Sequence, residues 1–229
     1  MRASSLFEPK TQECAELKYD YIIWDFNGTI FDDVQIDIDS LNELLKRREL
    51  PLVKDREEYK EGFMFPIKQW YVNRGFDLEK ESFDDVAVEW LNEYLSREPE
   101  AGLVKGVAET LKFFKGQNVK QVIISASEIS MLRRQLKMLG VEEYFEEILG
   151  LDNYYAAGKK GIALEWRKNH PDDKLLFLGD TDHDYFVAEA IGADCVLIAE
   201  GHQSANKLKQ MPGVMAVLDS QKEVVKIFS

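Results

Sequence analysis

Two short acidic segments of the sequence follow runs of apolar residues and could bind a cation. Asp25 directly follows the run IIW and begins the sequence DFNGT. The run LLFL of residues 175–178 is followed by GDTDHD, which carries Asp180, Asp182 and Asp184. Carboxylates that gather at one place repel one another unless a cation lies between them, and Mg²⁺ suits a site of carboxylates, a carbonyl, waters and a phosphate. If the two segments meet in the fold, they predict a Mg²⁺ site that can receive a phosphate group.

Each segment also has a simpler interpretation when it is taken alone. Asp-x-Asn-Gly is an ordinary turn sequence, in which Gly28 lets the chain turn sharply. Acidic residues after Gly179 would interact favourably with the dipole of a helix that begins there. Asp182 and Asp184 are the residues for which this interpretation is strongest. The chemistry therefore depends on the elements that bring the two segments together.

Short apolar runs alternate along the chain with segments of helical periodicity, which is typical of a parallel sheet covered by helices on both faces. The expected strands are 21–24, 121–124, 147–149, 175–178, 195–198 and 214–218. Open sheets of this kind bind ligands at the carboxyl ends of their strands. We therefore expect Asp25, Ser125 and Asp180 to lie together at one edge of the sheet.

A long stretch between the first and second expected strands has no good strand pattern. Its apolar residues recur at helical spacing, and they are Val34, Ile38, Leu41, Leu45, Phe83, Val86, Trp90 and Tyr94. We interpret residues 34–100 as an all-helical insertion into a core made of residues 1–33 and 101–229. The insertion also holds four aromatic residues that either line a pocket or form its own core, and they are Phe63, Phe65, Trp70 and Tyr71.

The order of these features resembles the four motifs of the haloacid dehalogenase superfamily. The motifs are DFNGT, the strand-end Ser125, a lysine near position 159 and GDTDHD, and they span nearly the whole chain. The sequence looks like the phosphoglycolate phosphatase-like members, and many members carry a helical cap between the first two motifs. The resemblance implies a Rossmann-like core, a helical cap at residues 34–100, and a Mg²⁺-dependent phosphohydrolase with an aspartyl-phosphate intermediate.

The resemblance implies roles for the acidic residues, position by position. Asp25 would attack phosphorus and would also bind Mg²⁺. The backbone carbonyl of Asn27 and the side chain of Asp180 would be further metal ligands, and Asp184 would act through metal-bound water. A carboxylate that attacks phosphorus divides a difficult hydrolysis into two easier steps.

The resemblance also implies a set of residues around the substrate phosphate. Ser125 would bind phosphate oxygens, with Ala126 and Thr29 as further substrate-binding positions. Lys159 would neutralise charge on the phosphate and on the nucleophile, although the adjacent Lys160 fits the loose motif as well. A metal ion and a lysine that face the phosphoryl oxygens would stabilise the transition state.

Asn27 departs from the pattern of the family, whose phosphatases usually carry aspartate at this position as a general acid and base. An amide cannot donate and retake a proton as a carboxyl group does, and such help is worth about 10²–10⁴-fold in rate. Hydrolysis of alkyl phosphates would then be slow, unless Asp32 or Asp33 takes over the role. The alternative function is a phosphate-ligand binding protein with weak or lost turnover. Lone histidines are more often structural than catalytic, so His183 and His202 are left outside the catalytic set.

The composition limits the partners of the chain. Its 42 acidic and 29 basic residues give a net charge of −13, which disfavours nucleic acid or an anionic membrane as the main partner. A small phosphorylated metabolite, as the resemblance implies, remains the expected partner. The two cysteines, Cys14 and Cys195, are far apart, and neither a signal peptide nor a membrane span is expected, so the cytoplasm is the expected location. A monomer or a small homo-oligomer is expected, and the sequence does not identify the physiological substrate.

Overall fold

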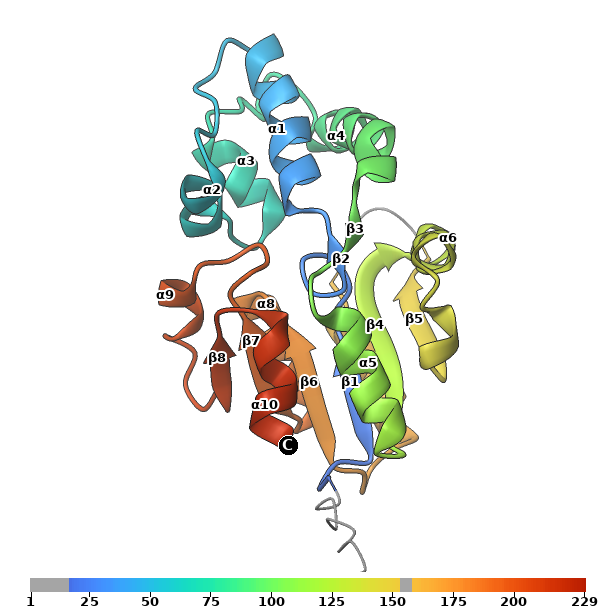
Figure 1. Ribbon diagram of the computed structural model, residues 1–229. Coiled ribbons are helices and arrows are strands. Elements are labelled where there is room, and N and C mark those ends of the chain that lie inside the picture. Colours follow the sequence, from blue (N-terminus) through green and yellow to red (C-terminus); the bar gives the residue numbers. More distant parts are fainter. Residues whose placement is uncertain (1–16, 153–157) are drawn as a thin grey trace, which may run out of the picture.

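A computed structural model of the chain describes residues 17–152 and 158–229, and at its centre lies one sheet of six parallel strands (Figure 1). The strands lie in the order β5-β4-β1-β6-β7-β8. Their bounds are Tyr21–Trp24 (β1), Lys120–Glu128 (β4), Glu147–Leu151 (β5), Leu175–Gly179 (β6), Asp194–Ile198 (β7) and Ala216–Leu218 (β8). These strands are the six expected apolar runs, so the predicted Rossmann-like parallel-sheet fold is confirmed.

Helices cover both faces of the sheet, which explains why its central strands are apolar along their whole length. One face packs against α5 (Val107–Gly116), α6 (Ile129–Leu139) and α10 (Val224–Phe228). The other face packs against α7 (Lys160–Lys168), α8 (Asp182–Ile191) and α9 (Ala205–Leu208). Short 3₁₀ helices lie at Glu98–Glu100, Glu142–Tyr144 and Gln221–Glu223.

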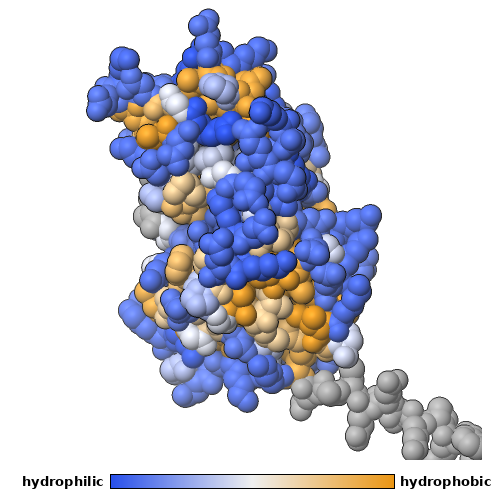
Figure 2. All heavy atoms as spheres, turned by 90° about the vertical axis from the view of Figure 1, so that its left-hand side faces the viewer, coloured by the Kyte–Doolittle hydropathy of each residue, from blue (hydrophilic) through white to orange (hydrophobic). Residues whose placement is uncertain are grey.

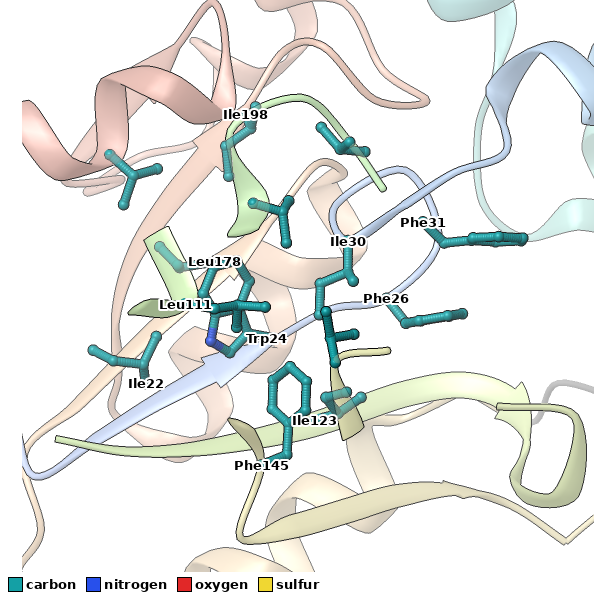
Figure 3. Packing of buried hydrophobic residues seen from close by; sticks show 14 of the residues in the cluster. Ile22, Trp24, Phe26, Ile30, Phe31, Leu111, Ile123, Phe145, Leu178 and Ile198 are labelled. Carbon is teal, nitrogen blue, oxygen red and sulfur yellow. The ribbon is translucent and has the colours of Figure 1, made fainter. Parts of the chain in front are cut away.

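The side chains of β1 anchor the strand on both faces of the sheet, because successive strand residues point to opposite sides. Trp24 packs with Leu111 of α5 in one hydrophobic cluster (Figure 3), and its indole Nε1 donates to Gln121 Oε1 at 3.2 Å. Ile23 packs in the cluster on the opposite face. Each fully buried side chain of this kind contributes about 1.5–3 kcal/mol. The two clusters thereby fix the position of Asp25, which directly follows the strand.

Four helices lie between two short antiparallel strands, β2 (Phe31–Asp32) and β3 (Gly102–Leu103), which the sequence did not predict. The helices are α1 (Val34–Arg47), α2 (Arg56–Gly62), α3 (Ile67–Asn73) and α4 (Phe83–Arg97). They form a layer above the carboxyl ends of the sheet strands (Figure 1), and their buried side chains make a third hydrophobic cluster. We call this layer the cap. Its assignment as a separate domain with bounds at residues 34 and 100 stays a prediction.

The surface of the molecule is mostly hydrophilic on the side that Figure 2 shows. Apolar residues reach the surface of that side at the cap end and again over the core. Within residues 17–152 and 158–229, every helix is too short or too polar to cross a lipid bilayer.

Leu44→Ala should destabilise the protein, because Leu44 of α1 is fully buried in the cap cluster. The substitution removes buried methyl groups and leaves a cavity, so we expect the free energy of unfolding to fall by about 2–5 kcal/mol. Leu95→Ala on α4 makes the same chemical change at a side chain that is 37% exposed, and it should cost about 0.5 kcal/mol. Urea unfolding followed by circular dichroism measures both, and equal losses would contradict the packing described for the cap.

Candidate active site

Three buried carboxylates meet at the carboxyl ends of β1 and β6. Asp25 follows β1, and its backbone N–H donates to the carbonyl of Leu178 at 2.8 Å, which continues the pairing of the two strands. Asp180 directly follows β6, and Asp184 lies in the first turn of α8. One carboxylate oxygen from each residue lies within 4.8 Å of the other two. The two acidic segments of the sequence therefore meet, as the strand order requires.

Lys159 is the lysine that reaches this cluster. It lies just before α7, is 2% exposed, and its ammonium contacts both Asp25 Oδ1 and Asp184 Oδ1. Lys160 is the first residue of α7 and is exposed to solvent. Lys159 is therefore the one of the two lysines that contacts the expected nucleophile, and its contact with a substrate phosphate stays a prediction.

The carboxylate of Asp180 is held from two sides. The hydroxyl of Thr29 donates to its Oδ1 at 3.0 Å, and the backbone N–H of His202 donates to its Oδ2 at 2.6 Å. A glycine precedes each of these two donors, Gly28 before Thr29 and Gly201 before His202. A Cβ at either glycine would lie too close to the Asp180 carboxylate. Gly28 also has a φ of 72°, which glycine adopts readily. Thr29 therefore orients an acidic residue, and its direct contact with substrate stays a prediction.

The two carboxylate oxygens of Asp184 have different partners: Oδ1 contacts Lys159, and Oδ2 accepts hydrogen bonds at the start of α8. Its Oδ2 accepts from the backbone N–H of Asp180 at 3.0 Å and from the N–H and hydroxyl of Thr181 at 2.9 and 2.8 Å. This pattern caps the start of α8, so the helix-start interpretation describes part of its role. Asp182 instead pairs with Gln203, which accepts from the Asp182 N–H at 2.7 Å and donates to its Oδ1 at 2.9 Å. Asp182 is thus engaged away from the three carboxylates.

The lysine does not balance the negative charge of this cluster. Burial raises the pKa of Asp25 well above its usual range; Lys159 lowers it, and the charges of Asp184 and Asp180 raise it further. Burial also raises the pKa of Asp180, to about 6, where the nearby positive charge of His202 lowers it and Asp184 raises it. Burial acts upward on Asp184 as well, but Lys159 outweighs it and holds that pKa below its usual range. A further cation would stabilise the ionised forms of Asp25 and Asp180.

The donor set of this site fits Mg²⁺. Carboxylate oxygens are the hard ligands that this ion prefers, and the three residues could hold a metal. The glycines beside Asp180 keep that carboxylate free of steric crowding. The individual ligand roles of Asp25, Asp180, Asp184 and the Asn27 carbonyl stay predictions.

Ser125 lies in β4, next to the carboxyl end of β1. Trp24 pairs with Ile123 in the sheet, so Ser125 lies one residue beyond the neighbour of Asp25. The register of β4 shifts after residue 124, and the buried Ser125 hydroxyl accepts from the Ser127 N–H at 3.0 Å. Ala126, next to it, is half-buried. The expected contact of Ser125 and Ala126 with a phosphate stays a prediction.

The side chain of Asn27 is held by three other side chains. Its Nδ2 donates to Asp33 Oδ2 at 2.6 Å and to the Tyr94 hydroxyl at 3.2 Å, and its Oδ1 accepts from the Ser127 hydroxyl at 2.6 Å. Sequence reasoning missed Tyr94 and Ser127 as neighbours of this position and named Asp33 only as an alternative acid. Asp32, the other alternative, is exposed and lies 3.5 Å from the guanidinium of Arg56. Asp33 is therefore the nearer of the two to Asn27.

His202, which was left outside the catalytic set, lies at the centre of a polar network that joins the core to the cap. Its Nε2 lies 3.3 Å from Asp33 Oδ1 and its Nδ1 lies 2.9 Å from the Tyr59 hydroxyl. Tyr59 donates to Asp37, which also accepts from the indole of Trp90 at 2.8 Å. Burial lowers the pKa of His202, but the hydrogen bond and charge of Asp33, with further acidic neighbours, raise it to about 10. The available sequence signal was its place just after an expected strand, because its partners are distant in sequence.

The aromatic candidates of the cap divide into two groups. Trp70 and Tyr71 are buried in the cap cluster, and Phe63 joins the same cluster while its ring centroid lies 5.2 Å from that of His202. The ring centroid of Phe65, which is half-buried, lies 4.8 Å from that of His183. Phe63 and Phe65 therefore contact the core beside the carboxylate cluster, and a contact with substrate stays a prediction.

Comparison with known proteins gives consistent matches. The haloacid dehalogenase-like hydrolase family matches residues 22–198. A phosphoglycolate phosphatase of Pseudomonas fluorescens is 24% identical over 200 residues, which are 82% of this chain and 72% of that protein. A hydrolase of the haloacid dehalogenase-like family from Streptococcus pneumoniae superposes with a TM-score of 0.78 at 18% identity, over 93% of this chain and 99% of the other. Protein tyrosine kinase A of Mycobacterium tuberculosis has a TM-score of 0.76 at 20% identity, over the same shares.

The family match runs from β1 to the end of β7 and contains the four segments that carry Asp25, Ser125, Lys159 and Asp180. The chain therefore belongs to the haloacid dehalogenase-like hydrolase family, as the order of its motifs indicated. The two solved structures share the fold, and their different names illustrate that one fold can carry different activities.

Gly201→Ala should weaken metal binding, because the added Cβ would collide with the Asp180 carboxylate. We expect the affinity for Mg²⁺, measured by the rise of the melting temperature during a Mg²⁺ titration, to fall by about 10–100-fold. Gly161→Ala in α7 is the control, since its added Cβ would meet no described side chain and no other part of the described chain within 4 Å, its own helix and chain neighbours aside. Unchanged Mg²⁺ affinity in the Gly201 variant would show that crowding of Asp180 does not matter for the metal.

Proposed function

We propose that this chain is a Mg²⁺-dependent phosphatase for a small phosphorylated metabolite, with Asp25 as the nucleophile. The observation that carries the proposal is the contact of Lys159 with Asp25, beside the carboxylates of Asp180 and Asp184. A nucleophilic carboxylate, an ammonium and ligands for a hard cation are the groups that phosphoryl transfer needs, because its catalysis is mostly positioning and charge stabilisation.

In the first step, a carboxylate oxygen of Asp25 forms a bond to phosphorus while the bond from phosphorus to the leaving oxygen breaks. The electron pair of the broken bond stays on the leaving oxygen, and the phosphoryl group remains on Asp25. Lys159, which already lies against Asp25 Oδ1, would face the negative charge of the phosphoryl oxygens. Ser125 and the backbone beside it would hold the same oxygens in place.

In the second step, a water oxygen attacks the same phosphorus and the bond to Asp25 breaks. Inorganic phosphate leaves, the Asp25 carboxylate is restored and one proton passes to the solvent. Asp25, Asp180 and the Asn27 carbonyl would hold Mg²⁺, which supplies positive charge against the phosphate oxygens. Thr29 and the backbone of His202 keep Asp180 oriented for this role.

The amide of Asn27 sets the kind of substrate that we expect. Without a carboxyl group at this position, the leaving oxygen must depart with little protonation. Acyl phosphates, phosphoanhydrides and nitrophenyl phosphate leave as weak bases, so they need less help than alkyl phosphates do. We infer that the rate rises steeply with the acidity of the leaving group.

The relative from Pseudomonas fluorescens supports a small phosphorylated substrate, since its name is phosphoglycolate phosphatase. The structural neighbour from Mycobacterium tuberculosis is named a kinase, and kinases also transfer phosphoryl groups. Both names agree with a site for phosphoryl transfer, and water is the acceptor that we propose for this chain.

The first test is a screen of the purified protein with Mg²⁺ against phosphorylated metabolites and nitrophenyl phosphate, with release of inorganic phosphate as the readout. Turnover of one class would support the proposal and name the leaving group. Tight binding of phosphorylated ligands without any turnover would instead support the alternative of a binding protein.

Asp25→Asn should abolish turnover while the fold stays intact, because the amide keeps the shape of the side chain and loses the nucleophilic carboxylate. We expect kcat to fall by at least about 10³-fold, with the circular dichroism spectrum unchanged. Asp32→Asn is the matched control, because Asp32 is exposed and should leave turnover as it is. Activity near the wild-type rate in the Asp25 variant would mean that another group attacks phosphorus.

EDTA should abolish turnover and added Mg²⁺ should restore it, because the buried carboxylates need a cation to neutralise their charge. Asp180→Asn should raise the Mg²⁺ concentration for half-maximal activity by about 10-fold or more. Asp182→Asn makes the same chemical change at a residue that is hydrogen-bonded to Gln203, and it should leave the Mg²⁺ concentration for half-maximal activity unchanged. Normal turnover by metal-free protein would remove Mg²⁺ from the proposal.

A further inference from the structure

The amide of Asn27 is hydrogen-bonded to three other side chains of the described residues. Its Nδ2 donates to Asp33 Oδ2 at 2.6 Å and lies 3.2 Å from the Tyr94 hydroxyl, and its Oδ1 accepts from the Ser127 hydroxyl at 2.6 Å. These bonds also fix the orientation of the amide, because a carboxylate can only accept and must face the NH₂ group. Asn27 is therefore held as a part of a network of side chains.

Asp33 is the acceptor at the centre of that network. Its Oδ1 accepts from the Gly28 N–H at 2.8 Å and lies 3.3 Å from His202 Nε2. Its Oδ2 accepts from Asn27 at 2.6 Å and from Tyr94 at 2.8 Å. The Asp33 carboxylate is buried. It holds the turn that follows the nucleophile at two points, the backbone N–H of Gly28 and the side chain of Asn27. It also connects that turn to the cap, because Tyr94 lies on α4.

A second carboxylate at position 27 would meet the first one directly. The Asn27 nitrogen lies 2.6 Å from Asp33 Oδ2, and an aspartate at 27 would put an oxygen in its place with no proton to share. Two carboxylates at that separation repel strongly, and the repulsion is largest where water is excluded. The neutral side chain at 27 is thus the one that suits a charged side chain at 33.

We propose that Asn27 and Asp33 form a positioning pair that carries one negative charge between them, and that the place of this charge sets the leaving-group preference of the site. In the native arrangement the charge lies at position 33, beside His202, and the pair holds the nucleophile turn without offering a proton to the leaving oxygen. A carboxyl group at position 27 is accommodated only when position 33 is neutral. The effect on substrate preference rests on the proposed phosphatase function, whereas the coupling between the two positions does not.

The test compares four full-length proteins: wild type, Asn27→Asp, Asp33→Asn and the reciprocal exchange Asn27→Asp with Asp33→Asn. For each, the melting temperature and kcat/KM are measured with nitrophenyl phosphate and with 2-phosphoglycolate, an alkyl phosphate. Asp32→Asn is the control, because it makes the same change as Asp33→Asn at the adjacent exposed residue.

In the wild-type background, Asn27→Asp should lower the melting temperature by about 5 °C or more and kcat/KM for nitrophenyl phosphate by about tenfold or more. In the Asp33→Asn background, the same substitution should cost little stability. There it should raise kcat/KM for 2-phosphoglycolate, relative to nitrophenyl phosphate, by about a hundredfold, because a carboxyl group can then serve the leaving oxygen. A network that is only structural would not change the ratio of the two substrates.

The proposal is overturned if Asn27→Asp has the same effect on melting temperature in both backgrounds, or if the single Asn27→Asp variant is already stable and faster on 2-phosphoglycolate. Should Asn27→Asp fail to fold, folding of the reciprocal exchange supports the proposal, and failure of both overturns it. If the wild-type protein hydrolyses no phosphorylated substrate in the presence of Mg²⁺, the proposed function fails. The melting temperatures of the four proteins then still decide whether positions 27 and 33 are coupled.

Discussion

The burial of three carboxylates beside one ammonium is the constraint on which the rest of this structure depends. Parallel pairing of β1 with β6 brings Asp25 and Asp180 to the same edge of the sheet, and the first turn of α8 adds Asp184. Such a cluster is costly in a folded protein unless each charge has a partner. Lys159 supplies one partner, and because burial still raises the pKa values of Asp25 and Asp180, a further cation would stabilise their ionised forms.

The loop of residues 199–203 links this centre to the cap. Lys60 of α2 donates to the carbonyl of Ala199 at 2.5 Å, and Tyr59 of the same helix lies against His202. The backbone of His202 in turn holds Asp180. The position of the cap helices and the orientation of a proposed metal ligand are therefore set by the same short loop. The three carboxylates beneath the cap are buried, and charge interactions are stronger where water is excluded.

The parts of the site that could be predicted are those with local patterns. Asp25 and Asp180 each follow an apolar run, and the strand periodicity of those runs placed both at one edge of the sheet. The sequence could restrict the choice of lysine only to Lys159 or Lys160. The two differ in burial, which no local sequence pattern reveals. The strands β2 and β3 have two residues each, too few for any periodicity. His202 escaped prediction because its partners lie far away in sequence, and Tyr59 reaches it across the boundary between cap and core.

Asn27 shows why a residue that departs from a family pattern is best interpreted with its neighbours. From the sequence alone, an amide in place of a carboxyl group is a loss, since it removes a proton donor. In the structure the carboxylate that lies closest to that amide is at Asp33, where it bonds to Asn27, to Tyr94 and to the Gly28 backbone, and faces His202. An aspartate at 27 would repel this carboxylate, so the amide is what allows the network to close. The environment of Asn27 therefore depends on a residue six positions away, to which its amide is hydrogen-bonded.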